Sequence, residues 1–487
     1  MKPSLFLAVV PAVAAHTPDF KTSEAGNPFV DGLYADPDNE FYNNQYWVYA
    51  TSSYEYDKQT YLDAFSSPDL VHWTKHSNVL VAADFKWARR AIWAPAPIWR
   101  NGKYYLYFGA NDIQTNSELG GIGVGISDQP QGPYKDALGK PLIGQYYNGA
   151  QPIDQDVFID DDGQAYIYYG GHGHANVAKL NRDMVTMGTL DDGTSYKEIT
   201  PENYVEGPQM MKRNGTYYLF WSEGGWGGPD YAVSYGMSKS PTGPFKRLAK
   251  ILEQDTSVAS GSGHNGVIHV PNTDIYYIVY HRHPLGENVD ANDRHLAYDR
   301  LYFNADGTIR PVRMLVHDNF NDGNMIGWTT YGGSWNTKKN ALNAGNSAGG
   351  KALLNTNFGD VDFSADIEIP SGNGGDAGLV FRASNLALET DAYDGYYAGI
   401  STSGKLVLGK AQSGSWTQLA SVTADIVPGK TYRVRVAAKK NAISVFAGDS
   451  TTAQLHVLDG TFARGMNGVR VFQTDAVFDN VKVEHLS

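Results

Sequence analysis

Residues that could do acid–base chemistry recur at one place in a repeated pattern. Asp36, Asp154 and Glu206 each stand 11 or 12 residues before the second residue of a short aromatic-rich strand. Trp93 and His264 stand 12 and 13 residues before the same point in two further copies. Buried like charges are costly and persist mainly where function needs them. Two carboxylates can act as general acid and general base, which is the pair that cleavage of a glycosidic bond requires.

Five aromatic strands are the elements that must position these residues. Their second residues lie 58, 61, 52 and 59 residues apart, and an Asn-Gly, Asp-Gly or Asn-Asn pair stands before four of them, as two-residue hairpins prefer. Repeats of this length predict a five-bladed β-propeller, in which the first strand of each blade lines the central channel and equivalent positions converge. The strands read YWVY from Tyr46, YYLY from Tyr104, AYIYY from Ala165, YYLFW from Tyr217 and YYIVY from Tyr276.

The composition is that of an all-β protein with many turns. The chain has 487 residues, of which 53 are Gly and 32 are Tyr, and it lacks long apolar helical periodicity. The net charge of −13 argues against nucleic acid as a partner but is compatible with a neutral polysaccharide. No stretch after the N-terminus is long and apolar enough to cross a bilayer, so we expect no membrane partner.

The first fifteen residues have the features of a secretory signal peptide. Lys2 provides a basic start, an apolar run LFLAVVPAVAA follows, and small residues precede His16. We therefore expect a secreted, extracellular protein. The sequence contains no cysteine, so an exported chain would depend on packing rather than on disulfides.

The pattern changes near residue 317, which divides the chain into two predicted domains. Residues 16–316 hold the five repeats of the propeller. From residue 317 to 487 the sequence consists of strands with period-2 alternation, such as DFSADIEI and TYRVRVAA. Such a segment predicts a β-sandwich of the jelly-roll kind, as found in carbohydrate-binding modules.

The propeller resembles glycoside hydrolase family 43 over roughly residues 25–316. The motifs that carry the resemblance are specific when taken together: YADP around Asp36, WAPAP from Trp93, IDQDVFIDDDGQAYIYYGG from Ile153, EGPQMMKRNGTYYLFWS from Glu206 and GSGHN around His264. One departure is Gln155, where the family often has Pro. By strand alternation Asp156 would face the same side as Asp154, although the repeat register favours Asp154.

The resemblance implies an inverting hydrolase and a role for each site residue. Asp36 is expected to be the general base and Glu206 the general acid, with Asp154 raising the pKa of the acid by like-charge repulsion. Base and acid on separate blades could stand about 6.5–9.5 Å apart, which inversion requires to admit water. The resemblance further implies that three residues bind substrate: Trp93 as a wall of the sugar subsite, His264 near the axis and Arg294 in contact with the sugar.

The expected activity is exo-acting removal of α-L-arabinofuranosyl groups from arabinoxylan, a plant cell-wall hemicellulose. β-Xylosidase activity is the close alternative, endo-arabinanase activity is less favoured, and a non-enzymatic sugar-binding propeller has no reason to keep base, acid and modulator in register. Fructan and sucrose hydrolases also join a five-bladed propeller to a sandwich. Their motifs centre on Asn-Asp-Pro-Asn, Arg-Asp-Pro and Glu-Cys, whereas this chain has Ala35-Asp36-Pro37 and neither Arg-Asp-Pro nor Cys.

The sandwich has two interpretations at this stage. It could bind polysaccharide through aromatic side chains such as Trp328, Trp335 or Trp416, or it could shape the catalytic cleft. We expect a monomer that needs no cofactor for its chemistry. A structural calcium ion would lie near His264 or use Asp318 and Asp479, but spacing alone identifies no ligand set.

Overall fold

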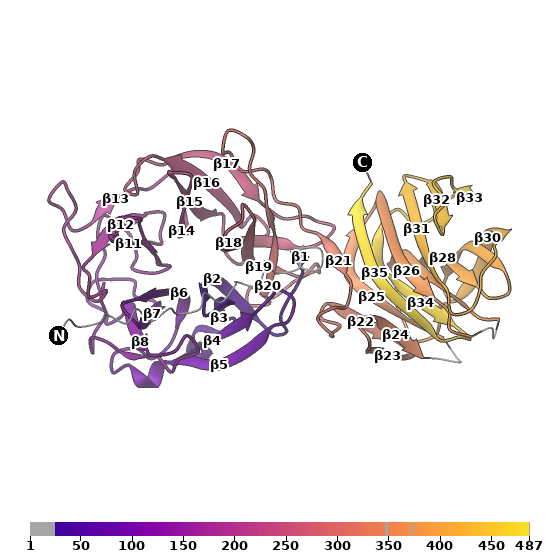
Figure 1. Cartoon of the computed structure of the whole chain (residues 1–487), viewed down its shortest axis with the longest axis horizontal. Helices are drawn as coiled ribbons and strands as arrows, with labels where there is room; N and C mark the ends of the chain where they lie inside the picture. The colour runs from indigo at the N-terminus through magenta and orange to yellow at the C-terminus, as the bar shows by residue number, and fades with distance from the viewer. Residues whose placement is uncertain (1–24, 346–348, 372–373, 487) are drawn as a thin grey trace, which may run out of the picture.

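The protein is all-β, with two bodies that lie side by side in Figure 1. This computed structural model describes residues 25–345, 349–371 and 374–486. The predicted signal peptide, residues 1–15, lies outside the described residues. Within the described part the helical elements are two 3₁₀ turns, η1 (Tyr56–Lys58) and η2 (Ala82–Asp84). The prediction of a five-bladed propeller followed by a sandwich is confirmed.

Five four-stranded antiparallel sheets form the propeller, arranged around a central axis (Figure 1). In the first four blades the chain runs from the axis outward, strand by strand. The blades comprise β2 (Tyr34–Tyr42), β3 (Gln45–Ser52), β4 (Tyr61–Ser67) and β5 (Thr74–Val81); β6 (Trp93–Arg100), β7 (Lys103–Ala110), β8 (Gly121–Ser127) and β9 (Lys135–Asp136); β10 (Asp156–Ile159), β11 (Ala165–Tyr169), β12 (Asn176–Leu180) and β13 (Lys197–Glu198); and β14 (Glu206–Arg213), β15 (Thr216–Glu223), β16 (Ala232–Ser238) and β17 (Lys246–Leu252).

The fifth blade closes the ring by joining distant parts of the chain. It consists of β18 (Ser260–His269), β19 (Tyr276–His283), β20 (His295–Leu301) and, outermost, β1 (Ala25–Gly26). The pairing is antiparallel, with Ala25 opposite Asp299. The first described strand therefore completes the last blade, which ties the two ends of the propeller together.

The hairpin turns follow the sequence prediction in three blades of four. Asn43 and Asn44 both have positive φ, as do the Asn-Gly pairs at 101–102 and 214–215. These φ values fit two-residue turns whose twist matches that of the flanking strands. The Asp-Gly pair differs, because the loop between Ile159 and Ala165 spans residues 160–164 and only Gly163 has positive φ.

Two antiparallel sheets packed face to face form the second body. Alternating side chains of both sheets, such as Phe363, Leu379 and Val469, are completely buried between them. One sheet has the order β23-β24-β35-β26-β31-β32-β33 with β21 paired to β35, and the other the order β22-β25-β34-β27-β28-β29-β30. Their bounds are β21 (Val316–Asp318), β22 (Trp328–Tyr331), β23 (Ser334–Thr337), β24 (Leu342–Gly345), β25 (Gly350–Phe358), β26 (Val361–Glu368), β27 (Asp376–Ser384), β28 (Asp394–Ser401), β29 (Lys405–Gln412), β30 (Ser415–Thr423), β31 (Thr431–Lys439), β32 (Ala442–Ala447), β33 (Leu455–Leu458), β34 (Gly465–Phe472) and β35 (Ala476–His485).

One apolar cluster runs from the propeller into the sandwich. It connects Phe220 of the fourth blade and Tyr280 of the fifth blade, through Met314 and Val316, to Phe358 of β25. Polar contacts also cross the junction, because the Asn357 N–H donates to the Ser257 carbonyl over 2.8 Å. The two bodies therefore share buried surface.

Candidate active site

A β-bulge positions the site residue on four of the five innermost strands. The pairing register shifts between Ala35 and Asp38 in β2, and between Trp93 and Ala96 in β6. The same shift follows Glu206 in β14 and flanks Gly263 in β18. A bulge bends the strand and redirects a side chain, so each site residue departs from the alternation of its strand.

The backbone at these points is left-handed. Asp36 has φ 49°, Asp154 φ 54° and His264 φ 45°, and the residues after the two remaining positions, Ala94 and Gly207, have φ 44° and 63°. Such conformations cost a non-glycine residue about 1–3 kcal/mol and concentrate at functional sites. A left-handed residue at or directly after the site position in all five repeats indicates that the fold directs these side chains in a similar way.

All six residues predicted for the site line one pocket at the propeller axis. Its volume is about 320 Å³, near the lower end of the roughly 300–1,000 Å³ of small-ligand sites. The predicted set consists of Asp36, Trp93, Asp154, Glu206, His264 and Arg294. Seven further residues line the pocket: Tyr56, Asp112, Gln114, Gln151, Ile153, His172 and Trp226.

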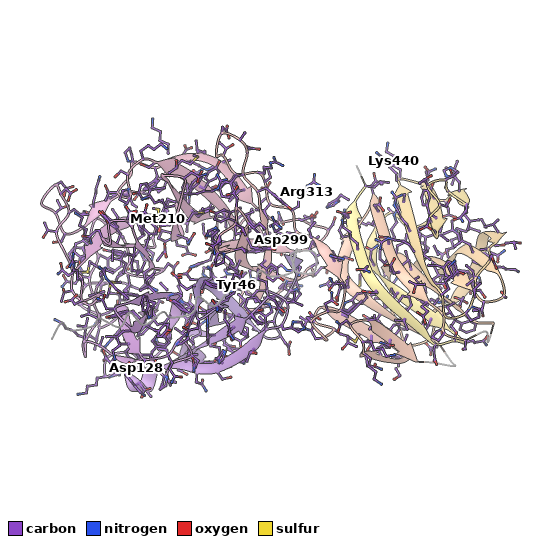
Figure 2. The ribbon with its side chains drawn as sticks, in the orientation of Figure 1. Tyr46, Asp128, Met210, Asp299, Arg313 and Lys440 are labelled. Carbon is purple, nitrogen blue, oxygen red and sulfur yellow. The ribbon has the colours of Figure 1, made fainter. Side chains whose placement is uncertain are left out.

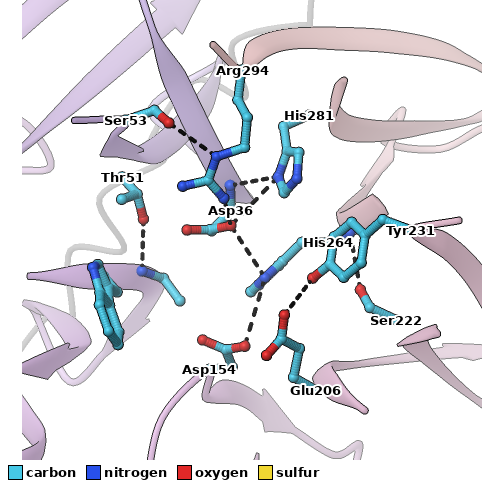
Figure 3. Close-up of polar contacts among 12 residues, drawn as sticks. Asp36, Thr51, Ser53, Asp154, Glu206, Ser222, Tyr231, His264, His281 and Arg294 are labelled. Carbon is cyan, nitrogen blue, oxygen red and sulfur yellow. Dashed lines mark hydrogen bonds and ion pairs between the residues drawn. The ribbon is translucent and has the colours of Figure 1, made fainter. Parts of the chain in front are cut away.

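Asp36 is held between one cation and two histidines, as Figure 3 shows. Arg294 Nη1 lies 3.1 Å from Asp36 Oδ1 and its Nε donates to Ser53 Oγ over 2.9 Å. His264 Nδ1 lies 3.5 Å from the same Asp36 oxygen and 3.8 Å from Asp154 Oδ2. Arg294 thus places a positive charge beside a carboxylate that is 9% exposed.

His281 is a neighbour of Asp36 that the sequence did not reveal. The Asp36 N–H donates to His281 Nδ1 over 3.1 Å, so that nitrogen carries no proton. Burial and the Arg294 charge hold the pKa of His281 well below its usual range. The ring is therefore neutral, and its 3.4 Å approach to Asp36 Oδ1 is a dipolar contact rather than an ion pair. The one sequence signal was its place at the end of the aromatic strand YYIVYH.

The environment of Glu206 favours its protonated form. Burial raises its pKa to about 7, and the charge of Asp36 acts in the same direction. The Tyr231 hydroxyl donates to Glu206 Oε1 over 2.9 Å, which opposes the rise. Burial raises the pKa of Asp154 well above its usual range, and the charge of Glu206 adds to that effect. The two buried carboxyls thus disfavour each other's ionisation.

Aromatic rings form the wall of the pocket. The Trp93 indole N–H donates to Gln59 Oε1, and its ring meets Tyr56 edge-on at 4.8 Å. Trp226 lies against the guanidinium of Arg294 at 4.8 Å. Trp226 occurs in the glycine-rich segment GGWGG, where no strand pattern marked it, so only the folded chain brings it to the pocket.

Asp154, rather than Asp156, faces the pocket. Asp156 instead lines a separate cavity at the opposite end of the axis, together with Asp38 and Glu40, and accepts the Met210 N–H over 2.6 Å. The expectation that Asp156 shares the side of Asp154 is wrong, because the left-handed backbone at Asp154 interrupts the alternation. Gln155, in place of the usual Pro, donates to the Ala94 carbonyl of the neighbouring blade.

Comparison with known proteins identifies the family of the propeller. The sequence profile of glycosyl hydrolases family 43 matches residues 25–309. The chain belongs to glycosyl hydrolases family 43. Its propeller is thus that of an enzyme family which hydrolyses glycosidic bonds.

Individual relatives within family 43 differ in their substrates. The chain is 43% identical over 309 residues to a β-D-galactofuranosidase of Aspergillus niger, covering 60% of this chain and 86% of the relative. It is 31% identical to an arabinoxylan arabinofuranohydrolase of Bacillus subtilis, covering 59% of this chain and 64% of that protein. The crystal structure of a thermostable family-43 glycoside hydrolase superposes with a TM-score of 0.50 at 26% identity, over 59% of this chain and 95% of that one.

The sandwich matches a different profile. Residues 317–484 match the 3-keto-alpha-glucoside-1,2-lyase-like domain. Two of the three tryptophans considered for sugar binding are used internally: Trp328 donates to Asp318 over 2.7 Å, and Trp335 packs near Phe478 at 6.3 Å. Trp416, 37% exposed, is the remaining candidate of the three.

The described residues contain no group of three His, Asp or Glu side chains arranged to hold a metal ion. At the predicted calcium position in the sandwich, Asp318 accepts N–H groups of Trp328 and Phe320, and Asp479 accepts that of Asn480. These carboxylates already have donors, so calcium stays a prediction for metal analysis. In the part of the chain that is described, no helix has the length and apolarity of a membrane span.

Proposed function

We propose that this family-43 enzyme removes terminal α-L-arabinofuranosyl groups from arabinoxylan. The observation that carries the proposal is the pairing, in one compact pocket, of an arginine-compensated Asp36 with a Glu206 whose pKa is raised to about 7. A general base must be ionised and a general acid protonated at the same pH. The arabinoxylan arabinofuranohydrolase among the relatives supports this choice of sugar.

The geometry supports a division of labour between the two carboxyls. Asp36 would take a proton from a water molecule that attacks the anomeric carbon. Tyr231 occupies Glu206 Oε1 as a donor, which leaves the other oxygen to protonate the departing glycosidic oxygen. His264, between Asp36 and Asp154, would keep the base aligned, and Asp154 would help to keep Glu206 protonated.

The pairing also favours inversion of the anomeric configuration. Asp36 and Glu206 lie on the innermost strands of different blades, β2 and β14, and a water must fit beside the sugar for a single displacement. Proton NMR during the first minutes of reaction would then detect the inverted anomer before mutarotation. Initial retention would contradict Asp36 as a base and favour it as a nucleophile.

The size of the pocket favours release of single terminal sugars. Its volume of about 320 Å³ suits one or two sugar rings. The cavity at the opposite end of the axis shares no lining residue with it, so the two cavities are distinct along the axis. An endo-acting enzyme needs a groove for several sugar rings, which is why endo-arabinanase activity is less favoured.

A second candidate activity is β-D-galactofuranosidase, favoured by the 43% identical relative. A β-D-galactofuranosyl group has the ring configuration of an α-L-arabinofuranosyl group and one additional hydroxymethyl carbon. Asp112 and Gln114 line the same pocket, and Asp112 Oδ1 accepts from Gln114 over 2.8 Å. Such polar groups could bind the additional hydroxyl, because carboxylates and amides are good partners for sugar hydroxyls.

A substrate panel at equal enzyme concentration tests these activities. We expect arabinose release from arabinoxylan to exceed galactose release from an aryl β-D-galactofuranoside and xylose release from xylobiose. Faster galactose release would replace the arabinofuranosidase proposal by the second candidate. Faster xylose release would make the protein a β-xylosidase.

We also propose that the protein is secreted and acts on its polysaccharide outside the cell. The support is the signal-like sequence at residues 1–15. Sequencing of the mature N-terminus from culture medium tests the proposal, with His16 as the expected first residue. Retention of an uncleaved chain in the cell would contradict it.

A further inference from the structure

A second cavity lies at the junction of the propeller and the sandwich. Its volume is about 170 Å³, and it shares no lining residue with the catalytic pocket. One wall is strand β25, at residues 354–356, and the opposite wall comes from the propeller, including Val258 and Pro284. The cavity therefore exists only where the two bodies meet.

A buried arginine without an anionic partner forms part of this cavity. Arg282, on β19, is 8% exposed. Its Nη1 donates to the Val258 carbonyl over 3.1 Å, while its Nε has no acceptor among the described residues. Within the described chain, no carboxylate lies at ion-pair distance from its guanidinium. Arg282 thus brings to the cavity a guanidinium that no carboxylate of the described chain contacts directly, although the charge of Asp299 acts on it from beyond ion-pair distance.

Two of the three other buried arginines of the described chain have close carboxylate partners. Arg294 lies 3.1 Å from Asp36, and Arg470 lies 2.9 Å from both Asp376 and Asp391. The third, Arg382, has a carboxylate only at 3.9 Å. In contrast, Arg282 has a single carbonyl partner. A buried charge that stays uncompensated is strongly unfavourable, so its retention calls for a partner from outside the chain.

The carboxylate whose charge acts on Arg282 is Asp299, and its hydrogen bonds come from other groups. Asp299, labelled on the sandwich-facing side of the propeller in Figure 2, accepts from Asn27 Nδ2, the Leu315 N–H and the Tyr280 hydroxyl. None of these hydrogen bonds comes from the Arg282 guanidinium. Among the described lining residues Asp31 carries the one carboxylate, and it is exposed to solvent.

The other residues that line the junction cavity indicate which kind of anion could pair with Arg282 there. Half of the lining residues are apolar: Pro28, Val30, Val258, Pro284, Val316, Ile326 and Leu354. His295, which also lines the cavity, is engaged with Asp293 over 2.9 Å. A hydrated inorganic ion or a hydroxyl-rich sugar acid would lose hydrogen bonds against such walls, whereas an apolar body would not.

We propose that the cavity is a binding site for a small organic carboxylate with an apolar body. The carboxylate oxygens accept hydrogen bonds from the Arg282 guanidinium, and the body lies between β25 and the propeller. Planar guanidinium groups match carboxylates by paired, charge-assisted hydrogen bonds. Its volume suits an acid of about one ring. The site is independent of the proposed hydrolase activity, since the two cavities share no residue.

Isothermal titration calorimetry with benzoate, a single-ring acid, tests the proposal on the full-length protein. The wild type should bind benzoate more tightly than the uncharged benzamide. The Arg282→Met variant keeps most of the side-chain volume and should bind benzoate roughly 10–100-fold more weakly, as expected for the loss of a hydrogen bond to a charged group. Arg310→Met, which removes a guanidinium on the exposed face of the propeller, is the matched control and should bind as the wild type does.

Three results would overturn the proposal. Wild-type protein could fail to bind benzoate at millimolar concentrations, or Arg282→Met could bind it unchanged. Arg282→Met could also melt well below the wild type in the absence of ligand, which would assign the guanidinium a structural role. We expect instead that its melting temperature is equal or higher, because replacing an uncompensated buried charge by an apolar side chain is neutral or stabilising.

Discussion

At Glu206, burial and a hydrogen bond act on the pKa in opposite directions. Burial and the charge of Asp36 raise it, and the Tyr231 hydroxyl lowers it, with a result of about 7. As the proposed general acid, Glu206 would stay protonated in mildly acidic surroundings, and activity would fall as the pH rises through that value. Changing a neighbour of Glu206 should therefore shift the pH at which kcat/KM falls on the alkaline side, which is the alkaline limb of the rate profile.

Removing either proposed catalytic carboxyl should abolish most of the turnover. We expect Asp36→Asn and Glu206→Gln each to lower kcat by roughly 10²–10⁴-fold, because a positioned general base or acid contributes about that much. Both changes conserve size, so the melting temperature should stay close to that of the wild type. Asp128→Asn, an exposed position paired with Lys103, is the control. A folded variant of either site residue with normal turnover would remove that residue from the mechanism.

Substitutions at the two neighbours of Glu206 should move the alkaline limb in opposite directions. Tyr231→Phe removes a hydrogen bond that stabilises the ionised form, so the pKa of Glu206 rises and the limb moves to higher pH. Asp154→Asn removes a carboxyl whose ionisation and that of Glu206 oppose each other, so the pKa of Glu206 falls and the limb moves to lower pH. The measurement is kcat/KM against pH with one aryl glycoside. Shifts of the same sign would contradict Glu206 as the acid.

At the scale of the element, the bulged start of four of the five inner strands is what directs the site residues to the pocket. Strand alternation would send Asp36 and Asp38 to the same face, yet Asp36 lines the catalytic pocket and Asp38 the opposite cavity. The left-handed backbone at Asp36 separates the two side chains in this way. The bulges are therefore functional parts of the blades.

Gly207 tests the role of the bulge directly. It has φ 63°, and a Cβ there would stand 3.2 Å from Ser222 Oγ and 3.3 Å from the His264 ring. We expect Gly207→Ala to cost about 1–2 kcal/mol in unfolding free energy from its backbone conformation and to lower kcat by displacing Glu206. Chemical denaturation and turnover are the two measurements.

Gly215→Ala is the matched control for the bulge. Gly215 has φ 69° but open space around a Cβ, and it lies in the hairpin turn of the same blade. It should show a similar loss of stability with unchanged turnover. Equal turnover in both variants would mean that the bulge does not position Glu206.

At the scale of the whole molecule, the sandwich stabilises the propeller without lining its pocket. All residues of the catalytic pocket lie between Asp36 and Arg294. The apolar cluster, in contrast, continues through Met314 and Val316 into the sandwich. We therefore expect the sandwich to contribute to the folding stability of the propeller but not to the lining of the catalytic pocket.

Deleting residues 317–487 separates the two contributions. The truncated chain exposes apolar surface that the sandwich covers, so its melting temperature should fall by several degrees; the shift is about 2–4 °C per kcal/mol for domains of roughly 150–250 residues and smaller for longer ones. Hydrolysis of a small aryl glycoside, measured well below that temperature, should stay within about twofold of the full chain, since the pocket is intact. An unchanged melting temperature would contradict the shared core. A lower rate on arabinoxylan alone would assign polymer binding to the sandwich.

The sequence by itself determined the repeat, the fold class and the register of the site. Aromatic strands with hairpin signals are local patterns, and five copies at similar spacing are satisfied by a radial fold. Residues at one position of the repeat must then converge on the axis, which is why Asp36, Asp154 and Glu206 could be selected without coordinates.

Only the tertiary structure decided how those residues face one another. Trp226 and His281 contact Arg294 and Asp36 of neighbouring blades, and Tyr231 contacts Glu206 within its own blade. No spacing along the chain encodes these contacts. Asp156 lines the opposite cavity because the left-handed backbone at Asp154 interrupts the two-residue period of a strand. Likewise Trp328 and Trp335 are used in internal packing of the sandwich. Local sequence patterns specify elements, whereas the pairing of side chains across elements depends on the complete fold.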